Sequence, residues 1–258
     1  MKLKVTIVQF DIVWENKKQN LDKVEKLISG LKGQTDLVVL PEMFSTGFSM
    51  NSANLAEENS GETISRIKHW SISLGFAICG SFIAKEKEQY FNRGFFISTT
   101  HATFFDKRHL FRVGDEPKYF SAGKERVIVE HKGFKICLLI CYDLRFPVWS
   151  RNIDNQYDLL IYMANWPMSR TRVWKSLLIA RAIENMAYVC GTNRIGKDGI
   201  GIEYNGNSMF IDAKGNVISN IENNLEQTET IEISKDELDS FRQKFPVWKD
   251  ADKFDLRY

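Results

Sequence analysis

The stretch LLICYDLRFP, residues 138 to 147, passes directly from an apolar run into a group of polar and reactive side chains. Leu138 to Ile140 continue a run of strand-forming residues, and Cys141 ends it. A tyrosine, an acid, an arginine and a proline follow at once. Two interpretations of Cys141 are open: a small hydrophobe that completes a buried strand, or a nucleophile displayed at the strand's end.

Comparable apolar runs recur along the chain. Each has the length of a strand, is rich in Val, Ile, Phe or Tyr, and is bounded by Gly, Pro, Asp or Asn. Several carry apolar residues at both odd and even positions, which indicates strands that are covered on both faces. The runs are LKVTIVQF (3–10), DLVVLP (36–41), FAICGSFI (76–83), RGFFIST (93–99), FKICLLIC (134–141), DLLIYMAN (158–165) and AYVCGTN (187–193).

Helical segments lie between some of these runs. Apolar spacing predicts helices over 16–31, 62–74, with Ile64, Ile67 and Ile72 as apolar positions, and 172–186. In the last of these, one stripe is expected to contain Val173, Leu177, Ala180 and Glu184. Hairpin turns are expected at NGN (205–207) and at 212–216. Strand–helix units together with hairpins predict a single α/β domain over residues 1–258, with mixed sheets.

Composition limits the class of function. The 258 residues carry a net charge of only +2, which gives no electrostatic reason to expect nucleic acid or a membrane as a partner. The apolar run at the N-terminus is too short for a signal peptide or a membrane span, so a cytoplasmic protein is expected. The four cysteines have neither CxxC spacing nor neighbouring histidines, so we expect no metal, cofactor or disulfide. The expected partner is a small molecule or a second copy of the chain.

Three strand ends carry unusual side chains. Glu42 follows the run LVVLP, where a carboxylate would be partly desolvated and usable as a base. Lys107 follows two phenylalanines in ATFFDKRHLF, where a fixed ammonium could hold an oxyanion or lower the pKa of a neighbouring thiol. Taken singly, each has an ordinary explanation: a solvated acid, a surface lysine, and for Cys141 a buried thiol like Cys137. A pairing of Cys141 with His109 is possible, but the spacing does not select it.

Together, the motifs LPEMF, DKRHLF and ICYDLRFP resemble the nitrilase superfamily of carbon–nitrogen hydrolases. That family's pattern is a Glu after a strand, a Lys in a DK.HL segment and a Cys after an apolar strand. The resemblance runs from VTIVQFDIVWENKKQNL to FPVWKDADKF and is closest to the bacterial omega-amidase branch. The marks of that branch are RNIDNQYDLLIYMANWP and ARAIENMAYVCGTNRIG. NGNSM (205–209) departs from the pattern, since many relatives have an acid before the Ser.

The resemblance implies a four-layer α-β-β-α sandwich that forms a homodimer. It implies a catalytic triad of Glu42, Lys107 and Cys141, with Glu116 as a supporting acid; its neighbour Asp115 is the alternative. The expected chemistry is amide hydrolysis through a thioester on Cys141, with the Tyr142 backbone N–H assisting at the oxyanion. The C-terminal tail, from about residue 240 to 258, is expected to pack on the domain or on a dimer partner.

The implied substrate is the terminal amide of a small 2-oxo dicarboxylic acid, such as 2-oxoglutaramate or 2-oxosuccinamate. Its free carboxylate needs a cation, for which Arg145 is the first candidate and Arg112 and Arg194 are others. Trp166 is expected to wall the pocket or to pack in the core. A nitrilase or an N-carbamoyl amide hydrolase would use the same triad. A non-catalytic small-molecule binding protein on the same fold is the alternative from another class.

Overall fold

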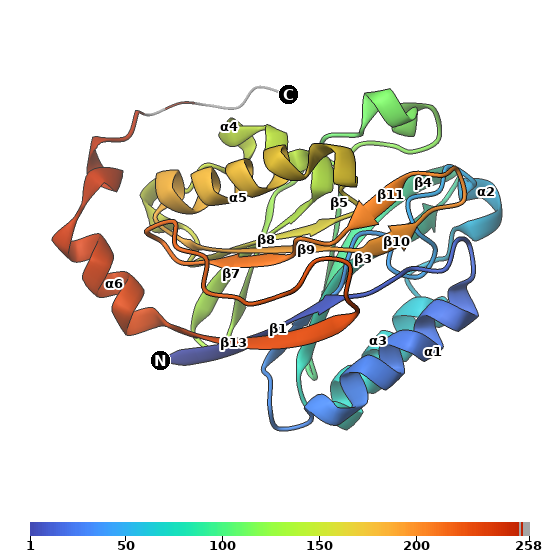
Figure 1. Cartoon of the computed structure of the whole chain (residues 1–258), viewed down its shortest axis with the longest axis horizontal. Coiled ribbons are helices and arrows are strands. Elements are labelled where there is room, and N and C mark those ends of the chain that lie inside the picture. The colour runs from blue at the N-terminus through green and yellow to red at the C-terminus, as the bar shows by residue number, and fades with distance from the viewer. Residues whose placement is uncertain (253, 255–258) are drawn as a thin grey trace.

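The computed structural model describes residues 1–252 and Phe254. Two mixed sheets lie face to face between two layers of helices (Figure 1). The first has the strand order β13-β1-β2-β3-β4-β5, and the second has the order β12-β9-β8-β7-β6. Helices α1 (Lys17–Ile28) and α3 (Glu62–Leu74) cover the first sheet, and α5 (Thr171–Asn185) covers the second (Figure 1). This arrangement confirms the predicted four-layer α-β-β-α sandwich.

The strands of the first sheet are β1 (Lys2–Gln9), β2 (Leu37–Val39), β3 (Ala77–Glu86), β4 (Gln89–Ile97), β5 (Ala102–Asp106) and β13 (Gln227–Ser234). Those of the second are β6 (Val127–His131), β7 (Phe134–Ile140), β8 (Leu159–Ala164), β9 (Tyr188–Asn193) and β12 (Met209–Ile211). A separate two-stranded ribbon joins β10 (Ile195–Lys197) to β11 (Glu203–Asn205). The remaining helices are α2 (Ser52–Leu55), α4 (Pro147–Ser150) and α6 (Lys235–Lys244).

Alternation along the strands divides the apolar side chains between two cores. Val39 and Phe96 belong to the cluster between the sheets, whereas their neighbours Val38 and Phe95 pack with residues of α1 and α3. Successive side chains of a strand point to opposite faces, so a run that is apolar at every position supplies both cores. The prediction of strands covered on both faces is therefore confirmed.

The apolar runs left out β6, β12 and β13, together with the two ribbon strands β10 and β11, and they indicated β5 only as the strand end before Lys107. β6, β12 and β13 are edge strands, and β13 (QTETIEIS) carries mostly polar side chains. An edge strand needs no apolar run, and polar side chains there discourage pairing with other chains. The whole of β13 nevertheless pairs with β1, from Gln227 to Ser234.

The predicted helices are present, with two corrections. Ile72 is 66% exposed rather than buried. The buried stripe of α5 contains Trp174, Leu178 and Ala182, one or two residues beyond the predicted one. The reason lies in β9, because a Cβ on Gly191 would come 2.4 Å from Leu178 and 2.8 Å from Trp174. The missing side chain lets these two residues dock on the sheet. Every helix of the described residues is too short or too polar to cross a bilayer.

The predicted turn at 205–207 is also misplaced. The ribbon β10–β11 turns at 198–202, where the Asp198 N–H donates to the Ile202 carbonyl at 3.0 Å. Gly206 instead lets the chain pass close to Gln9, whose side chain would lie 2.2 Å from an added Cβ. The turn at 212–216 forms as predicted, with the Asp212 N–H donating to the Asn216 carbonyl at 2.9 Å.

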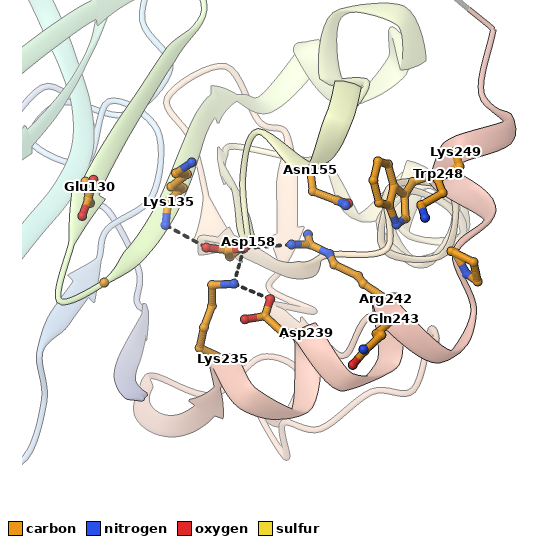
Figure 2. Close-up of a pocket in the computed structure, with 12 residues that line it drawn as sticks. Glu130, Lys135, Asn155, Asp158, Lys235, Asp239, Arg242, Gln243, Trp248 and Lys249 are labelled. Atoms are coloured by element: carbon orange, nitrogen blue, oxygen red, sulfur yellow. Dashed lines mark hydrogen bonds and ion pairs between the residues drawn. The ribbon is translucent and has the colours of Figure 1, made fainter.

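The C-terminal segment is anchored through Arg242 of α6 (Figure 2). Its guanidinium contacts Asp158 at 2.8 Å and donates to the carbonyls of Tyr157 and Met186, both at 2.8 Å. Lys235 lies 3.4 Å from the same carboxylate. These contacts hold α6 and the following turn Val247–Asp250 beside the second sheet. Of the predicted tail, Lys253 and residues 255–258 lie outside the described residues.

Candidate active site

The three unusual strand ends meet at one edge of the sandwich. Glu42 follows β2, Lys107 follows β5 and Cys141 follows β7, and all three line one cavity. Glu42 and Lys107 are 0% and 1% exposed, and Cys141 is 8% exposed. The structure therefore brings together three residues that are separated by 99 positions in the sequence (42 to 141). The interpretations of a solvated acid and a surface lysine are wrong.

Lys107 lies between two buried carboxylates. Its Nζ donates to Glu42 Oε1 at 2.8 Å and to the two oxygens of Glu116 at 3.0 and 3.1 Å. Asn92 Nδ2 also bridges the carboxylates, at 2.8 Å from Glu42 and 3.1 Å from Glu116. Glu116 rather than Asp115 enters this cluster, since Asp115 pairs with Lys118 on the surface. Sequence reasoning missed Asn92, whose only signal is a polar residue inside a buried strand.

Burial and charge oppose each other at the lysine. Burial alone would lower the pKa of Lys107, but the carboxylates of Glu116 and Glu42 outweigh it and raise the pKa. The ammonium is therefore charged across the physiological range. Burial also raises the pKa of Glu116; Lys107 opposes that rise and Glu42 adds to it. The Lys107 ammonium thus pairs with two carboxylates, those of Glu42 and Glu116. Their attraction is strong because the three groups lie in a buried region of low dielectric constant.

The turn that carries Cys141 is strained. Cys141 begins a short 3₁₀ helix, Cys141–Arg145, with a φ of +44°. A non-glycine residue in this left-handed region costs about 1–3 kcal/mol, a cost that recurs at functional sites. Asp143 holds the turn, because its carboxylate accepts from the Ile140 N–H at 3.0 Å. The Tyr142 N–H lies in the first turn of this helix, where N–H groups have no acceptor within the helix.

The same carboxylate ties this turn to the segment after Lys107. Asp143 Oδ1 accepts from the His109 backbone N–H at 3.0 Å and contacts His109 Nδ1 at 2.8 Å. The imidazole stacks on Phe146 with ring centres 3.8 Å apart. His109 is thus bonded to Asp143, which makes it a support for the turn rather than the base of a Cys–His pair.

The thiol itself is protonated in the resting protein. Burial raises the pKa of Cys141, Glu42 raises it further, and Lys107 only partly offsets them. Lys107 therefore acts on the thiol in the predicted direction, since its charge lowers the pKa of Cys141, but burial is the larger effect. Burial likewise raises the pKa of Cys137 to about 12. What separates the two cysteines is access, because Cys141 lines the cavity and Cys137 lies between the sheets.

Asn165, at the end of β8, completes the site. Its backbone N–H donates to Glu42 Oε2 at 2.9 Å, and its Nδ2 donates to the Glu42 carbonyl at 2.6 Å. Its carbonyl lies 3.8 Å from Cys141 Sγ. Asn165 lines the cavity, is 5% exposed, and its side-chain Oδ1 has no hydrogen-bond partner. Sequence reasoning selected its neighbour Trp166 and passed over this residue, although it stands at the same strand end.

Two of the four predicted substrate-binding residues line the cavity: Arg145 and Trp166. Arg194 is a correction, because its guanidinium is 0% exposed and contacts Asp11 at 2.9 Å and the Ile12 carbonyl at 2.9 Å. Arg112 is a second correction. It is exposed and lines a separate depression, with His109 and Phe146, rather than the cavity that contains Cys141.

The cavity is small and largely enclosed by aromatic and aliphatic side chains. Its volume is about 90 Å³, which is room for several water molecules and therefore for a small ligand. The β10–β11 ribbon contributes Asp198, Ile200, Ile202 and Tyr204 to its wall. A wider depression of about 490 Å³ lies beside α6. It is unsuited to acid–base catalysis through Asp158, because that carboxylate already forms salt bridges with Arg242 and Lys235 (Figure 2).

Comparison with known proteins agrees with this geometry. The family model described as carbon-nitrogen hydrolase matches residues 4–243. The chain is 43% identical to the omega-amidase YafV of Yersinia enterocolitica, over 98% of both chains. It is 34% identical to the 2-oxoglutaramate amidase of Bacillus subtilis, over 98% of this chain and 99% of that one.

A solved structure gives the same result. A carbon–nitrogen hydrolase superfamily protein from Xanthomonas campestris, with an arsenic adduct in its active site, is 40% identical. It superposes with a TM-score of 0.97 over 100% of both chains. The fold, the matched residues and these relatives together establish that the chain belongs to the carbon–nitrogen hydrolase family.

Proposed function

We propose that this amide-hydrolysing enzyme is an omega-amidase that acts through a thioester on Cys141. Its substrate would be the terminal amide of a small 2-oxo dicarboxylic acid, such as 2-oxoglutaramate or 2-oxosuccinamate, and its products the acid and ammonia. The observation that carries the proposal is that Cys141 shares a small cavity with the Lys107 ammonium and the Glu42 carboxylate. The names of the relatives from Yersinia enterocolitica and Bacillus subtilis support the substrate class.

In the first step, the Cys141 sulfur attacks the amide carbon and its proton passes to Glu42. Because the pKa of the resting thiol is raised, the proton leaves as the attack proceeds rather than beforehand. The Lys107 ammonium and the Tyr142 N–H stabilise the oxyanion. One such donor is worth about 3 kcal/mol of transition-state stabilisation.

In the second step, the tetrahedral intermediate loses its nitrogen. Glu42 returns the proton to the leaving nitrogen, the C–N bond breaks, and ammonia departs from a thioester. Water then attacks the thioester with Glu42 as the base, which releases the carboxylic acid and restores the thiol. Glu116 acts as the supporting acid, because its carboxylate lies 3.0 Å from the Lys107 ammonium and holds it in place.

A substrate panel tests the proposal. Purified enzyme should release ammonia from 2-oxoglutaramate, and more slowly or not at all from nitriles and N-carbamoyl amino acids of similar length. The reverse order of rates would replace the omega-amidase assignment by that of a nitrilase or N-carbamoyl amide hydrolase, which would use the same triad.

The alternative of a non-catalytic binding protein is tested at the nucleophile. Cys141→Ala should abolish turnover while leaving the melting temperature near that of the native protein, and Cys137→Ala is the matched control. A Glu42→Gln variant should also lose ammonia release, because the thiol proton, the leaving nitrogen and the attacking water all depend on that carboxylate. Unchanged turnover in Cys141→Ala would disprove the thioester route.

We also propose that the enzyme is a cytoplasmic homodimer. Its four cysteines are free thiols, as is usual in a reducing compartment. The homodimer is what the resemblance to the nitrilase superfamily implies. Light scattering of the purified protein at micromolar concentration should give the mass of two chains; a single-chain mass would reject the dimer.

A further inference from the structure

Among the described residues, two guanidinium groups face the cavity without a carboxylate partner. Arg145 ends the 3₁₀ helix that begins with Cys141, and Arg170 ends another, Met168–Arg170, at the start of α5. Both line the cavity. Across residues 1–252, neither guanidinium makes a salt bridge or hydrogen bond, so each is available to a ligand.

Each guanidinium is oriented by an aromatic ring. The Arg145 guanidinium lies 5.3 Å from the Trp166 ring centre, and that of Arg170 lies 5.3 Å from the Phe111 ring centre. Trp166 also donates its indole N–H to the Arg170 carbonyl at 2.9 Å. Stacking fixes the plane of a guanidinium and leaves its N–H donors free at the edge, so less entropy is lost when an anion binds.

The acids of the cavity do not neutralise these two cations. The Glu42 oxygens already accept from Lys107, Asn92 and Asn165. Asp198 Oδ1 accepts from the N–H groups of Ile200 and Ile202, at 3.0 and 2.9 Å.

The other oxygen of Asp198 is also occupied. Its Oδ2 accepts from the Tyr204 hydroxyl at 2.9 Å. Burial and the Asp198 charge raise the pKa of Tyr204, so the hydroxyl keeps the proton that it donates. The two guanidiniums therefore remain the available cationic donors on this wall.

We propose that Arg170 is a specificity-determining residue which, together with Arg145, binds the 2-oxo acid end of the substrate. This inference rests on the proposed function. A 2-oxo acid presents three acceptor oxygens in one plane, two on the carboxylate and one on the ketone. A single planar guanidinium pairs well with two oxygens, and a second guanidinium supplies donors for the third. The pair thus selects a 2-oxo acid over a simple carboxylic acid.

The test compares Arg170→Gln with Arg172→Gln, an exposed neighbour that removes the same charge outside the cavity. The substrates are 2-oxoglutaramate, succinamate, which lacks the ketone, and butanamide, which lacks the anion. Arg170→Gln should lower kcat/KM for 2-oxoglutaramate by about 10- to 100-fold, as expected for a lost charge-assisted hydrogen bond. The loss should fall mainly on KM, should be smaller for succinamate, and should be absent for butanamide.

Arg170→Lys should recover little, because an ammonium cannot reproduce the planar fork. Equal losses on all three substrates, or none on 2-oxoglutaramate, would overturn the assignment of Arg170. If the native enzyme hydrolyses none of these substrates, the proposed function fails. The role of Arg170 is then tested separately, by measuring the binding of a 2-oxo acid. Titration of Cys141→Ala with 2-oxoglutarate should show weaker binding when Arg170→Gln is added; unchanged binding overturns the inference independently of turnover.

Discussion

Replacing Lys107 by methionine removes the cation that holds two buried carboxylates together. Methionine keeps the length and much of the volume of the side chain, so packing against Phe48, 5.1 Å from the ammonium, is largely preserved. What remains is Glu42 and Glu116, both 0% exposed, sharing the amide of Asn92. The variant isolates the electrostatic contribution of the lysine to folding.

The size of the effect follows from burial. Breaking a fully buried ion pair by removal of one partner costs about 3–5 kcal/mol of unfolding free energy, because the other charge stays buried and unpaired. Three contacts of 2.8 to 3.1 Å are lost here, which places the expected cost in that range at pH 8. Turnover should also fall by about 10²–10³-fold, as for a lost oxyanion donor.

The unfolding free energy of Lys107→Met should depend on pH, and the direction of that dependence follows from the pKa of Glu116. Burial already raises the pKa of Glu116, and loss of Lys107 raises it further because the opposing attraction is gone. The folded variant then retains a proton that the unfolded chain has lost, so its stability falls as pH rises through that raised pKa. Between the ordinary glutamate value of about 4.3 and the raised value, the slope approaches 1.4 kcal/mol per pH unit.

Urea unfolding at pH 5.5 and pH 8, at one protein concentration, measures both quantities. Lys118→Met is the matched control, since this lysine is a surface residue and its loss should change stability by no more than about 0.5 kcal/mol. Adding Glu116→Gln to the Lys107 variant should recover much of the loss at pH 8. A Lys107→Met protein within about 1 kcal/mol of native at pH 8, or one destabilised equally at both pH values, would refute the reasoning.

Three further predictions concern the surroundings of the nucleophile. Asp143→Asn removes the charge of the carboxylate that caps the strained turn, so kcat should fall about tenfold or more while KM changes little. Steady-state kinetics and a thermal melt are measured together, because a lowered melting temperature would show that the fall in kcat is merely structural. Gly123→Ala should destabilise by about 1–3 kcal/mol and lower turnover, since a Cβ there would lie 2.0 Å from the carbonyl that precedes Lys107; a native-like melt would contradict this close approach. Without substrate, alkylation of Cys141 by iodoacetamide should be slow at pH 7 and still rising above pH 9, because its pKa is raised, whereas Cys137 should not react; a rate plateau below pH 8 would indicate a preformed thiolate.

Local sequence patterns were sufficient for the α/β class and for most of its strands and helices, whereas the four-layer sandwich was implied by the resemblance to the nitrilase superfamily. Apolar runs identified the buried strands, and the helix over 62–74 was predicted with its observed limits. These features depend on local patterning, in which each residue's preference agrees with its neighbours. The edge strand β13 escaped because only Ile231 and Ile233 are buried and its other residues are polar. The stripe of α5 was shifted because its position depends on a glycine in β9.

The active-site residues also fall into those that the sequence predicted and those that only the structure revealed. Its reactive residue types stood at strand ends, and the three motifs together identified Glu42, Lys107 and Cys141. Their convergence, and the entry of Asn92, Asn165 and Arg170 from other elements, depend on how two sheets and a ribbon pack. Residue type and position along a strand can be read from the amino-acid sequence. The hydrogen-bond partners of each side chain, its burial and the direction of its pKa shift arise only when distant segments exclude water from one another. The sequence by itself therefore determined the reactive groups and most of the strands and helices that carry them. Tertiary structure decided which charges are paired, which thiol is reachable and which arginines remain free to bind.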